Sequence, residues 1–321
     1  MDRHRARGRR ARPSRRKPLL SAAVASVVLV GATAAGTVYM KAQAHDGTSA
    51  VSSASVSASP SSSPAGSEEA SVEPVAEPSV DRDALLAKAL KSVPVTAGAR
   101  TSVAVLDVDS GESAAHGDAA FDTASIVKVN ILAALLLQAQ DADRHLSAQE
   151  KAYATKMIEN SDNASATALW AVIGRADGLD AANKRFGLSA TQGGDGELWG
   201  LTQTTAGDQL TLLRQVFGED SKLSSASRSY LQGLMGEIET DQRWGVSAAG
   251  DGSRWALKNG WLARSTTGLW DVNSIGRISA DGHDYLVATL SNGNSTQAKG
   301  ISLVEAVSKA AVSTFRDTTE D

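Results

Sequence analysis

The chain has 321 residues and a formal net charge of −4, an average over regions of opposite sign. Residues 1–17 hold nine Lys and Arg residues and one acid, whereas residues 81–321 hold 22 basic and 30 acidic residues. An acidic body argues against nucleic-acid binding, because neutralising phosphates requires a cationic face. The chain has no cysteine, which excludes disulfides, thiol catalysis and a lipid-modified cysteine.

The basic segment 1–18 is followed by an apolar stretch, residues 19–40, whose only ionisable side chain is Tyr39. About 20 apolar residues in a helix cross the hydrocarbon core of a bilayer, and a basic flank stays in the cytoplasm. We therefore expect residues 19–40 to be a transmembrane signal anchor or a signal peptide, with the body of the protein outside the cytoplasm. The Ala-Gln-Ala sequence ending at Ala44 resembles a signal-peptidase site, so cleavage there would give a secreted protein. We favour the retained anchor, because the apolar stretch is longer than a signal-peptide core of about 7–15 residues.

Residues 41–80 have a third composition, rich in Ser, Pro and Ala. Twelve Ser and four Pro residues fall within residues 45–80, with no aromatic side chain. Such a segment cannot bury enough apolar surface to offset the loss of chain entropy on folding. We expect a flexible linker over 41–80 and a folded domain over 81–321.

The folded region begins and ends with strands and has helices between them. Apolar periodicity predicts helices at 82–92, 125–140, 147–159, 162–173, 178–186, 204–217, 224–236 and 297–315. Alternating patterns and turn residues predict strands at 102–107, 114–116, 254–260, 269–279 and 283–291. Two early and three late strands indicate an α/β (α+β) fold, in which one five-stranded sheet is built from both chain ends around an inserted all-helical lobe.

The first motif whose residues could take part in a reaction is Ser125-Ile-Val-Lys128, at the start of a strongly apolar helix. Residues three apart share a helix face, so the lysine amine would lie beside the serine hydroxyl. A buried lysine with a lowered pKa can remove the proton that makes serine a poor nucleophile. Asp122 or Thr123 would cap the helix. Taken alone, the pattern also fits an ordinary helix start.

The second motif is Ser161-Asp162-Asn163, which separates two predicted helices. All three residue types favour the helix N-cap, so a purely structural interpretation is available. In the functional interpretation, the serine relays a proton to a leaving amine. The asparagine would then hold both a substrate amide and the catalytic lysine.

The third motif is Lys258-Asn259-Gly260-Trp261, at the end of a predicted strand. A lysine beside a glycine at a strand end offers a cation for a substrate carboxylate and an open backbone edge for an acyl group. A strand running into an Asn-Gly turn is the structural alternative.

Together, in this order and context, the three motifs resemble those of the serine β-lactamase and penicillin-binding protein superfamily, and of class A β-lactamases most closely. The resemblance spans residues 81–321 and implies the β-lactamase/transpeptidase-like fold with an antiparallel sheet. It implies that Ser125 is the acylated nucleophile and Lys128 its proton acceptor. Ser161 would protonate the leaving nitrogen, Asn163 would orient the substrate amide, and Lys258 would attract the substrate carboxylate. The backbone N–H groups of Ser125 and Trp261 would form the oxyanion hole.

Two departures from the family pattern bear on turnover. Asn259 stands where the family usually has Thr or Ser, whose hydroxyl helps to bind the substrate carboxylate, although Asn can still donate a hydrogen bond. The family's deacylating acid is a Glu followed by Leu and Asn on an omega loop. Here Glu197 and Leu198 resemble the start of that motif, but Trp199 replaces the Asn. Glu197 is therefore a candidate water-activating base, with an exposed turn acid as the alternative.

Arg243 lies upstream of the third motif, where relatives often place an Arg for the substrate carboxylate, and a surface ion pair is its alternative role. The histidines show no metal-ligand spacing and no Gly-rich phosphate loop follows a strand, so we expect no metal and no cofactor. Three functions stay open. They are a β-lactamase-like hydrolase of β-lactams or peptide-like amides, a D-alanyl-D-alanine carboxypeptidase or penicillin-binding protein acting on peptidoglycan stem peptides, and a wall-tethered binding module without turnover.

Overall fold

The computed structural model describes residues 80–316. The expected basic segment 1–18, the apolar stretch 19–40 and all but the last residue of the linker 41–80 therefore lie outside the described residues, and those three expectations stay predictions. Within residues 80–316, no helix combines the length and the apolar character that crossing a membrane requires.

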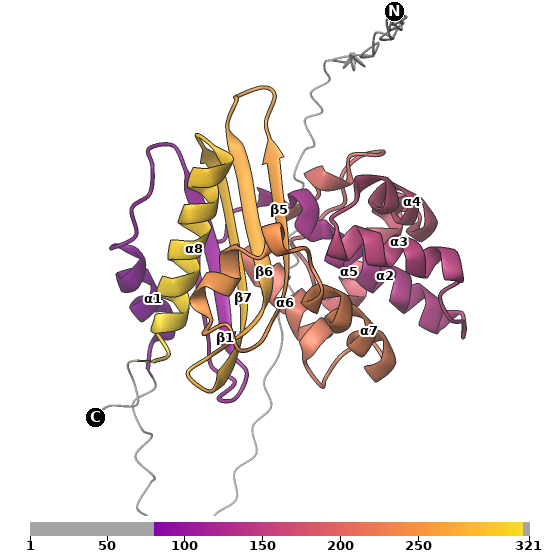
Figure 1. The fold of residues 1–321 in the computed structure, drawn as a ribbon, viewed down its shortest axis with the longest axis horizontal. Helices are drawn as coiled ribbons and strands as arrows, with labels where there is room; N and C mark the ends of the chain where they lie inside the picture. Colours follow the sequence, from indigo (N-terminus) through magenta and orange to yellow (C-terminus); the bar gives the residue numbers. More distant parts are fainter. Residues whose placement is uncertain (1–79, 317–321) are drawn as a thin grey trace, which may run out of the picture. The chain divides into compact units, whose positions relative to one another are not determined.

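One antiparallel sheet organises the described part of the chain (Figure 1). Its strands lie in the order β2-β1-β7-β6-β5, so the first two strands pair with the last three, as the sequence predicts. Their bounds are β1 Arg100–Asp107, β2 Ser113–His116, β5 Trp255–Ala263, β6 Trp270–Ala280 and β7 His283–Asn294. This topology confirms the expected mixed fold with a sheet made from both chain ends.

Helices precede, interrupt and follow the strands. Their bounds are α1 Arg82–Leu90, α2 Val127–Asp141, α3 Ala148–Glu159, α4 Asn163–Ile173, α5 Arg175–Phe186, α6 Ala206–Phe217, α7 Ser225–Gly236 and α8 Gln297–Ser313. Short 3₁₀ turns occur at Ala124–Ile126 (η1), Trp199–Leu201 (η2), Thr240–Gln242 (η3) and Gly245–Ala249 (η4). The helices α2 to α5 form the lobe drawn on the right of Figure 1.

Both faces of the sheet are buried, and alternating residues of a strand face the two sides. Val103 and Val105 of β1 pack with α1 and α8, whereas Ala104 and Leu106 pack with the helical lobe. Side chains alternate between the faces of a strand, so strands buried on both sides read as continuous apolar runs. The sheet is consequently the middle layer, with α8 on one face and α6 on the other (Figure 1).

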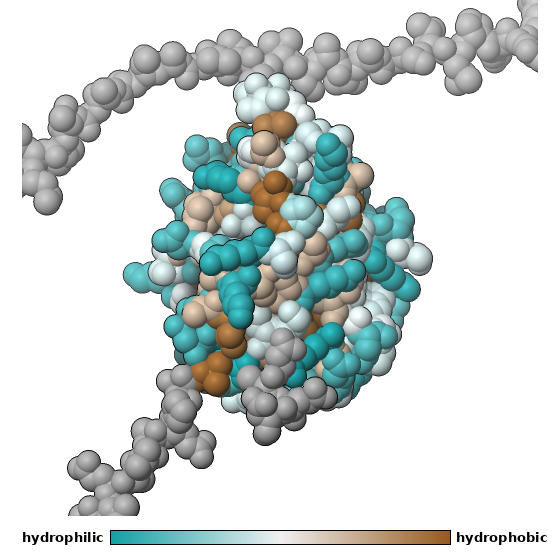
Figure 2. All heavy atoms as spheres, turned by 90° about the vertical axis from the view of Figure 1, so that its left-hand side faces the viewer, coloured by the Kyte–Doolittle hydropathy of each residue, from teal (hydrophilic) through white to brown (hydrophobic). Residues whose placement is uncertain are grey.

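The solvent-facing side of α1 and α8 is polar. Figure 2 shows this side of the molecule with mainly hydrophilic and intermediate surface, and only small hydrophobic areas between them. The exposed large hydrophobic side chains of the described residues are Val80, Leu85, Val95, Val108, Val172 and Leu198. Single exposed apolar side chains of this kind are normal for a soluble surface.

The structure differs from the sequence prediction around the first motif. Ser125 lies in the η1 turn that precedes α2. Neither Asp122 nor Thr123 caps η1 or α2 with a side-chain hydrogen bond. Thr123 occupies the N-cap position without a side-chain cap bond, while the Asp122 carboxylate accepts hydrogen bonds from Gln203 and Arg264. A second, two-stranded sheet, β3 Phe121–Asp122 with β4 Gln203–Thr204, was not predicted, because two-residue strands have no readable periodicity.

Candidate active site

The first motif places a serine hydroxyl beside a buried amine. The Lys128 Nζ atom donates a hydrogen bond to Ser125 Oγ at 3.0 Å, and Lys128 is 0% exposed. Ala124, directly before the serine, has a φ angle of 48°, and Ser161 has one of 55°. Left-handed backbone at residues other than glycine is strained and persists where the surrounding structure holds it in place. Both strained positions lie next to the groups that would react.

The second motif meets the same amine from the opposite side. Lys128 Nζ donates to the Ser161 carbonyl at 2.6 Å, to Ser161 Oγ at 3.1 Å and to Asn163 Oδ1 at 2.8 Å. Asp162 caps α4 by accepting a hydrogen bond from the Ser165 backbone N–H at 2.7 Å. Asp162 therefore caps the helix, as the structural interpretation expects, and its two neighbours contact the lysine. Their roles towards a substrate stay predictions.

The third motif brings a second buried amine to Ser161. Lys258 Nζ donates to Ser161 Oγ at 3.1 Å and to the Asn259 carbonyl at 2.9 Å, and Lys258 is 0% exposed. One serine hydroxyl therefore lies between two lysines that come from α2 and β5. This arrangement can pass a proton from one amine to the other through the hydroxyl.

Burial makes both amines weak bases. Desolvation lowers the pKa of Lys128 from 10.5 to about 7, against a smaller opposing effect of Asp162. Desolvation, followed by repulsion from Lys128, lowers the pKa of Lys258 well below its usual range. A neutral Lys128 at physiological pH is what proton abstraction from Ser125 requires.

Gly260 allows β5 to approach the nucleophile closely. A Cβ atom at this position would lie 2.7 Å from the Ser125 backbone nitrogen and 2.8 Å from both Ile126 N and Thr123 O. Only glycine fits such a contact without displacing the backbone. The next residue, Trp261, lines the same cleft as Ser125, which is the arrangement that an oxyanion hole from these two residues needs.

The cleft around Ser125 has a volume of about 600 Å³, within the range of small-molecule sites. Ser125, Asn163, Glu197 and Trp261 line it, together with the apolar side chains of Leu198, Trp199, Leu201 and Leu262. The structure thus brings together Ser125, Lys128, Ser161, Asn163, Lys258, Gly260 and Trp261, whose catalytic or binding roles stay predictions.

Asn259 lies elsewhere than its expected role requires. Its side chain is 0% exposed, and its Nδ2 donates to the backbone carbonyls of Gln242 at 2.6 Å and Trp244 at 3.0 Å. The amide hydrogens that were expected to bind a substrate carboxylate are therefore used inside the protein. The physical reason is the loop 242–245, whose carbonyls need donors once they are buried.

Glu197 and Arg243 lie at the edge of the site or outside it. Glu197 lines the cleft, but its carboxylate accepts a hydrogen bond from Arg175 Nε at 2.7 Å, and its side chain is 52% exposed. No hydrogen bond or ion pair joins it to Ser125 or Lys128 among the described residues. The Arg243 guanidinium stacks on Trp255 at 4.7 Å, and its Nε donates to the Ile238 carbonyl. In this conformation Arg243 does not offer the cation that the sequence suggested for a substrate carboxylate.

The sequence analysis missed residues that hold the serine turn. Asn273 Nδ2 donates to the carbonyls of Asp122 at 2.9 Å and Thr123 at 3.0 Å, so β6 fixes the backbone immediately before the nucleophile. Arg264 lines the cleft and pairs with Asp122. The only available signal was their place on or directly after the late strands, with Asn273 on β6 and Arg264 just beyond β5, which does not distinguish them from other polar residues there.

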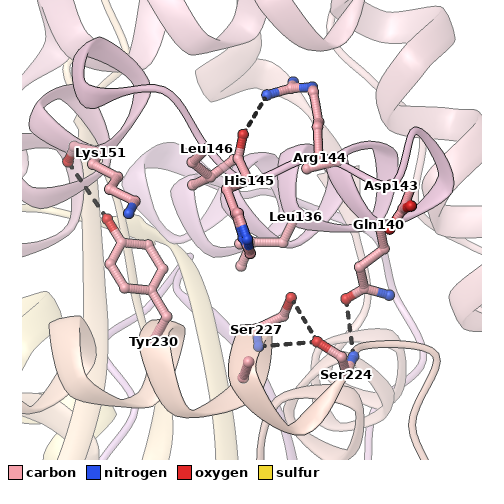
Figure 3. Close-up of a pocket in the computed structure, with 12 residues that line it drawn as sticks. Leu136, Gln140, Asp143, Arg144, His145, Leu146, Lys151, Ser224, Ser227 and Tyr230 are labelled. Carbon is pink, nitrogen blue, oxygen red and sulfur yellow. Dashed lines mark hydrogen bonds between the residues drawn. The ribbon is translucent and has the colours of Figure 1, made fainter.

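A second hollow, of about 540 Å³, lies in the helical lobe between the end of α2 and α7 (Figure 3). Its serines cap a helix, because Ser224 Oγ accepts from the Ser227 N–H and donates to Ser227 Oγ. Tyr230 there points to the Lys151 carbonyl, at 3.5 Å. The hollow contains none of the motif residues, and the hydrogen bonds of its serines run to each other and to Gln140 rather than to His145 or Lys151, so the cleft at Ser125 is the candidate active site.

One group within residues 80–316 has the composition of a metal site. Asp107 and Asp109, at the end of β1 and just after it, and His283, at the start of β7, offer ligand atoms within 4.8 Å of one another. His283 Nδ1 lies 3.6 Å from Asp107 and 3.5 Å from Asp109, so the group is equally an ion-pair cluster when the histidine is protonated. None of its members lines the cleft at Ser125.

Comparison with known proteins identifies the family. Residues 85–151 and 150–315 match the sequence model described as the beta-lactamase enzyme family, which is well over half of the chain. The chain belongs to the beta-lactamase enzyme family. Family membership agrees with the three motifs and with the sheet topology. No curated protein matches the sequence closely enough to count as a relative.

Solved structures show the same fold as this beta-lactamase-family chain. PBP-A is 22% identical, with a TM-score of 0.63, and the alignment covers 73% of this chain and 96% of PBP-A. A PBP-A mutant described as an acyl-enzyme complex with penicillin G is 21% identical, covering 73% and 97%, with a TM-score of 0.62. The TLA-1 extended-spectrum β-lactamase is 17% identical, covering 73% and 98%, with a TM-score of 0.63. At these identities the likeness establishes the fold alone.

Proposed function

We propose that the chain is an extracytoplasmic serine hydrolase. Its Ser125 would be acylated by β-lactams or peptide-like amides. The observation that carries the proposal is the 3.0 Å hydrogen bond between Ser125 Oγ and the fully buried amine of Lys128. Membership of the beta-lactamase enzyme family supports this chemistry. The penicillin G complex of the PBP-A mutant supports β-lactams as substrates.

Acylation would begin with proton transfer from Ser125 Oγ to neutral Lys128. The serine oxygen attacks the substrate carbonyl, and the resulting oxyanion accepts hydrogen bonds from the backbone N–H groups of Ser125 and Trp261. Each such donor typically stabilises a transition state by about 2.7–4 kcal/mol. The close approach of β5 at Gly260 is what would place the two donors on either side of the carbonyl oxygen.

The leaving nitrogen would receive its proton from Ser161. The Ser161 hydroxyl lies 3.1 Å from each lysine amine, so the proton that Lys128 gains can return through it to the substrate. Asn163 lines the cleft and also accepts from Lys128, a position from which its amide can orient the substrate. A substrate carboxylate near Lys258 would favour the charged form of that lysine.

A specific observation favours the second function, a D-alanyl-D-alanine carboxypeptidase or penicillin-binding protein acting on peptidoglycan stem peptides. Rapid β-lactam turnover needs a base that activates water after acylation. The nearest candidate, Glu197, is half-exposed and paired with Arg175 at 2.7 Å. An acyl-enzyme without a dedicated base would be long-lived, as expected of a penicillin-binding protein.

We propose the location of the enzyme from its sequence. The basic segment 1–18 and the apolar stretch 19–40 support a single-pass anchor that leaves the folded domain, 81–321, outside the cytoplasm on the linker 41–80. Cleavage after Ala44 would release the same domain as a secreted protein.

Intact mass spectrometry of the full chain after incubation with penicillin G tests the proposal. We expect a covalent adduct that Ser125→Ala abolishes. Rapid hydrolysis of a chromogenic cephalosporin would indicate a β-lactamase, whereas a long-lived adduct would indicate a penicillin-binding protein. A folded chain that forms no adduct would favour the binding module, and hydrolysis unaffected by Ser125→Ala would contradict the mechanism.

A further inference from the structure

Trp199 stands over the amine that would activate the nucleophile. It begins the η2 turn, lines the cleft, and is half-buried. Lys128 Nζ lies 5.0 Å from the centroid of its indole ring, within the range of a cation–π contact. The ring therefore lies against Lys128 at the cleft, whose wall Ser125 and Asn163 also form, and Ser161 contacts the same amine.

The indole is held in this place by its neighbours. Trp199 Nε1 donates to Thr167 Oγ1 on α4 at 3.1 Å. The same loop is tied to α4 a second time, because Trp170 Nε1 donates to the Gly196 carbonyl at 2.7 Å. The far end of this loop is joined to the residue before η1, because Thr123 N donates a hydrogen bond to the Thr202 carbonyl at 2.9 Å. These three attachments orient the ring over the lysine rather than towards solvent.

The charged groups around Lys128 do not account for its lowered pKa. Asp162 favours the ammonium form of Lys128, an effect smaller than that of burial. Lys258 lies across the Ser161 hydroxyl, and its own pKa is lowered by desolvation and by repulsion from Lys128. Glu197, on the same loop as Trp199, is paired outward with Arg175. Desolvation is the largest influence on the pKa of Lys128. Of the side chains that both line the cleft and lie against this amine, Trp199 is the large apolar one, beside the polar Ser125 and Asn163.

We propose that Trp199 is a positioning residue that keeps water away from Lys128 and so sets the pH range in which Ser125 can be acylated. The inference rests on the proposed function, because it assigns Lys128 the role of proton acceptor. A ring face also attracts an ammonium, but water solvates that ion better than an indole does. Removing the ring therefore raises the lysine pKa, and Lys128 stays protonated at neutral pH.

The test measures the rate of penicillin G adduct formation on the full chain between pH 5 and pH 10. For Trp199→Ala we expect the apparent pKa of acylation to rise by at least about one unit, equivalent to a tenfold loss of rate at the acidic end. Above that pKa the rate should approach that of the natural protein, which shows that the site is intact. Trp199→Phe keeps an apolar ring and should shift the pKa by less than half as much.

A matched control is Trp270→Phe, because Trp270 lies at the start of β6 and does not line the cleft. An unchanged apparent pKa in Trp199→Ala would overturn the inference, as would an equal shift in Trp270→Phe. If Trp199→Ala does not fold, Trp199→Phe and Trp199→Leu decide, since leucine leaves part of the amine open and must shift the pKa more than phenylalanine. Absence of any adduct on the natural chain would instead refute the proposed function.

Discussion

Lys128 and Lys258 donate hydrogen bonds to the same atom, Ser161 Oγ, each at 3.1 Å. Both amines are fully buried, and no carboxylate within residues 80–316 forms an ion pair with either. Charging both amines this close together in a dry site is unfavourable, and repulsion from Lys128 adds to the desolvation that lowers the pKa of Lys258. The arrangement suits a site that must remove a proton from one hydroxyl and return it through another.

The first prediction concerns the pH dependence of acylation. Lys128 accepts a proton only when it is neutral, and its pKa is lowered to about 7. The rate of adduct formation should therefore rise with pH through the region near 7 and level off above it. Stopped-flow or quenched mass spectrometry with penicillin G measures this profile. A rate that keeps rising towards pH 10 would show that Lys128 has an ordinary lysine pKa.

The second prediction concerns stability. Between pH 7 and 10.5, the folded chain leaves Lys128 neutral while the unfolded chain binds a proton at this residue. Because the unfolded state binds more protons, the free energy of unfolding should rise with pH in this window, by up to about 1.4 kcal/mol per unit. Lys128→Met should reduce this slope, measured by urea unfolding at pH 7, 8 and 9. An unchanged slope would mean that the lysine is not desolvated in the folded protein.

Gly260→Ala should impair acylation through the backbone. Its Cβ would lie 2.7 Å from Ser125 N, so β5 must move away from the serine turn and the oxyanion donors separate. Loss of one such donor typically costs about 10²–10³-fold in rate, which is the decrease expected in adduct formation. Gly233→Ala is the matched control, because this exposed helical position has no atom within 4 Å of a new Cβ. Equal rates in the two variants would contradict the close approach.

The part of the site that was predictable from sequence consists of motifs whose members are close along the chain. Ser125 and Lys128 share one turn of structure, and Asp162 caps a helix as its residue type suggests. Side-chain direction was not predictable at Asn259, because it depends on carbonyls of a loop about fifteen residues earlier. The same holds for Trp199, whose loop is held over Lys128 by three hydrogen bonds to two separate segments, α4 and the residues before η1.

Asn259→Ala separates a structural role from a substrate-binding role. The side chain satisfies two buried carbonyls, so its removal should lower the free energy of unfolding by about 1–3 kcal/mol. In a domain of this size that corresponds to a fall in melting temperature of several degrees, measurable by calorimetry. The concentration dependence of acylation should change little. A large loss of substrate affinity without a loss of stability would restore the role in carboxylate binding.

Glu197→Gln tests whether the cleft has a deacylating base. The Glu197 side chain is 52% exposed and paired with Arg175 at 2.7 Å, and it forms no hydrogen bond with Ser125 or Lys128 in the described structure. An exposed ion pair of this kind is worth only about 0–1 kcal/mol, so its loss should not disturb the fold. We expect the rate of adduct formation and the half-life of the adduct both to stay within about twofold of the natural chain.

The control for Glu197→Gln is Asp195→Asn, a neutralised acid on the same exposed loop. If Glu197 activates water, only Glu197→Gln will lengthen the half-life of the penicillin adduct, by at least about tenfold, with acylation unchanged. That result would assign the chain to rapid turnover of β-lactams. Equal half-lives in the two variants and the natural chain would mean that Glu197 does not activate water for deacylation at Ser125. That result agrees with a penicillin-binding role.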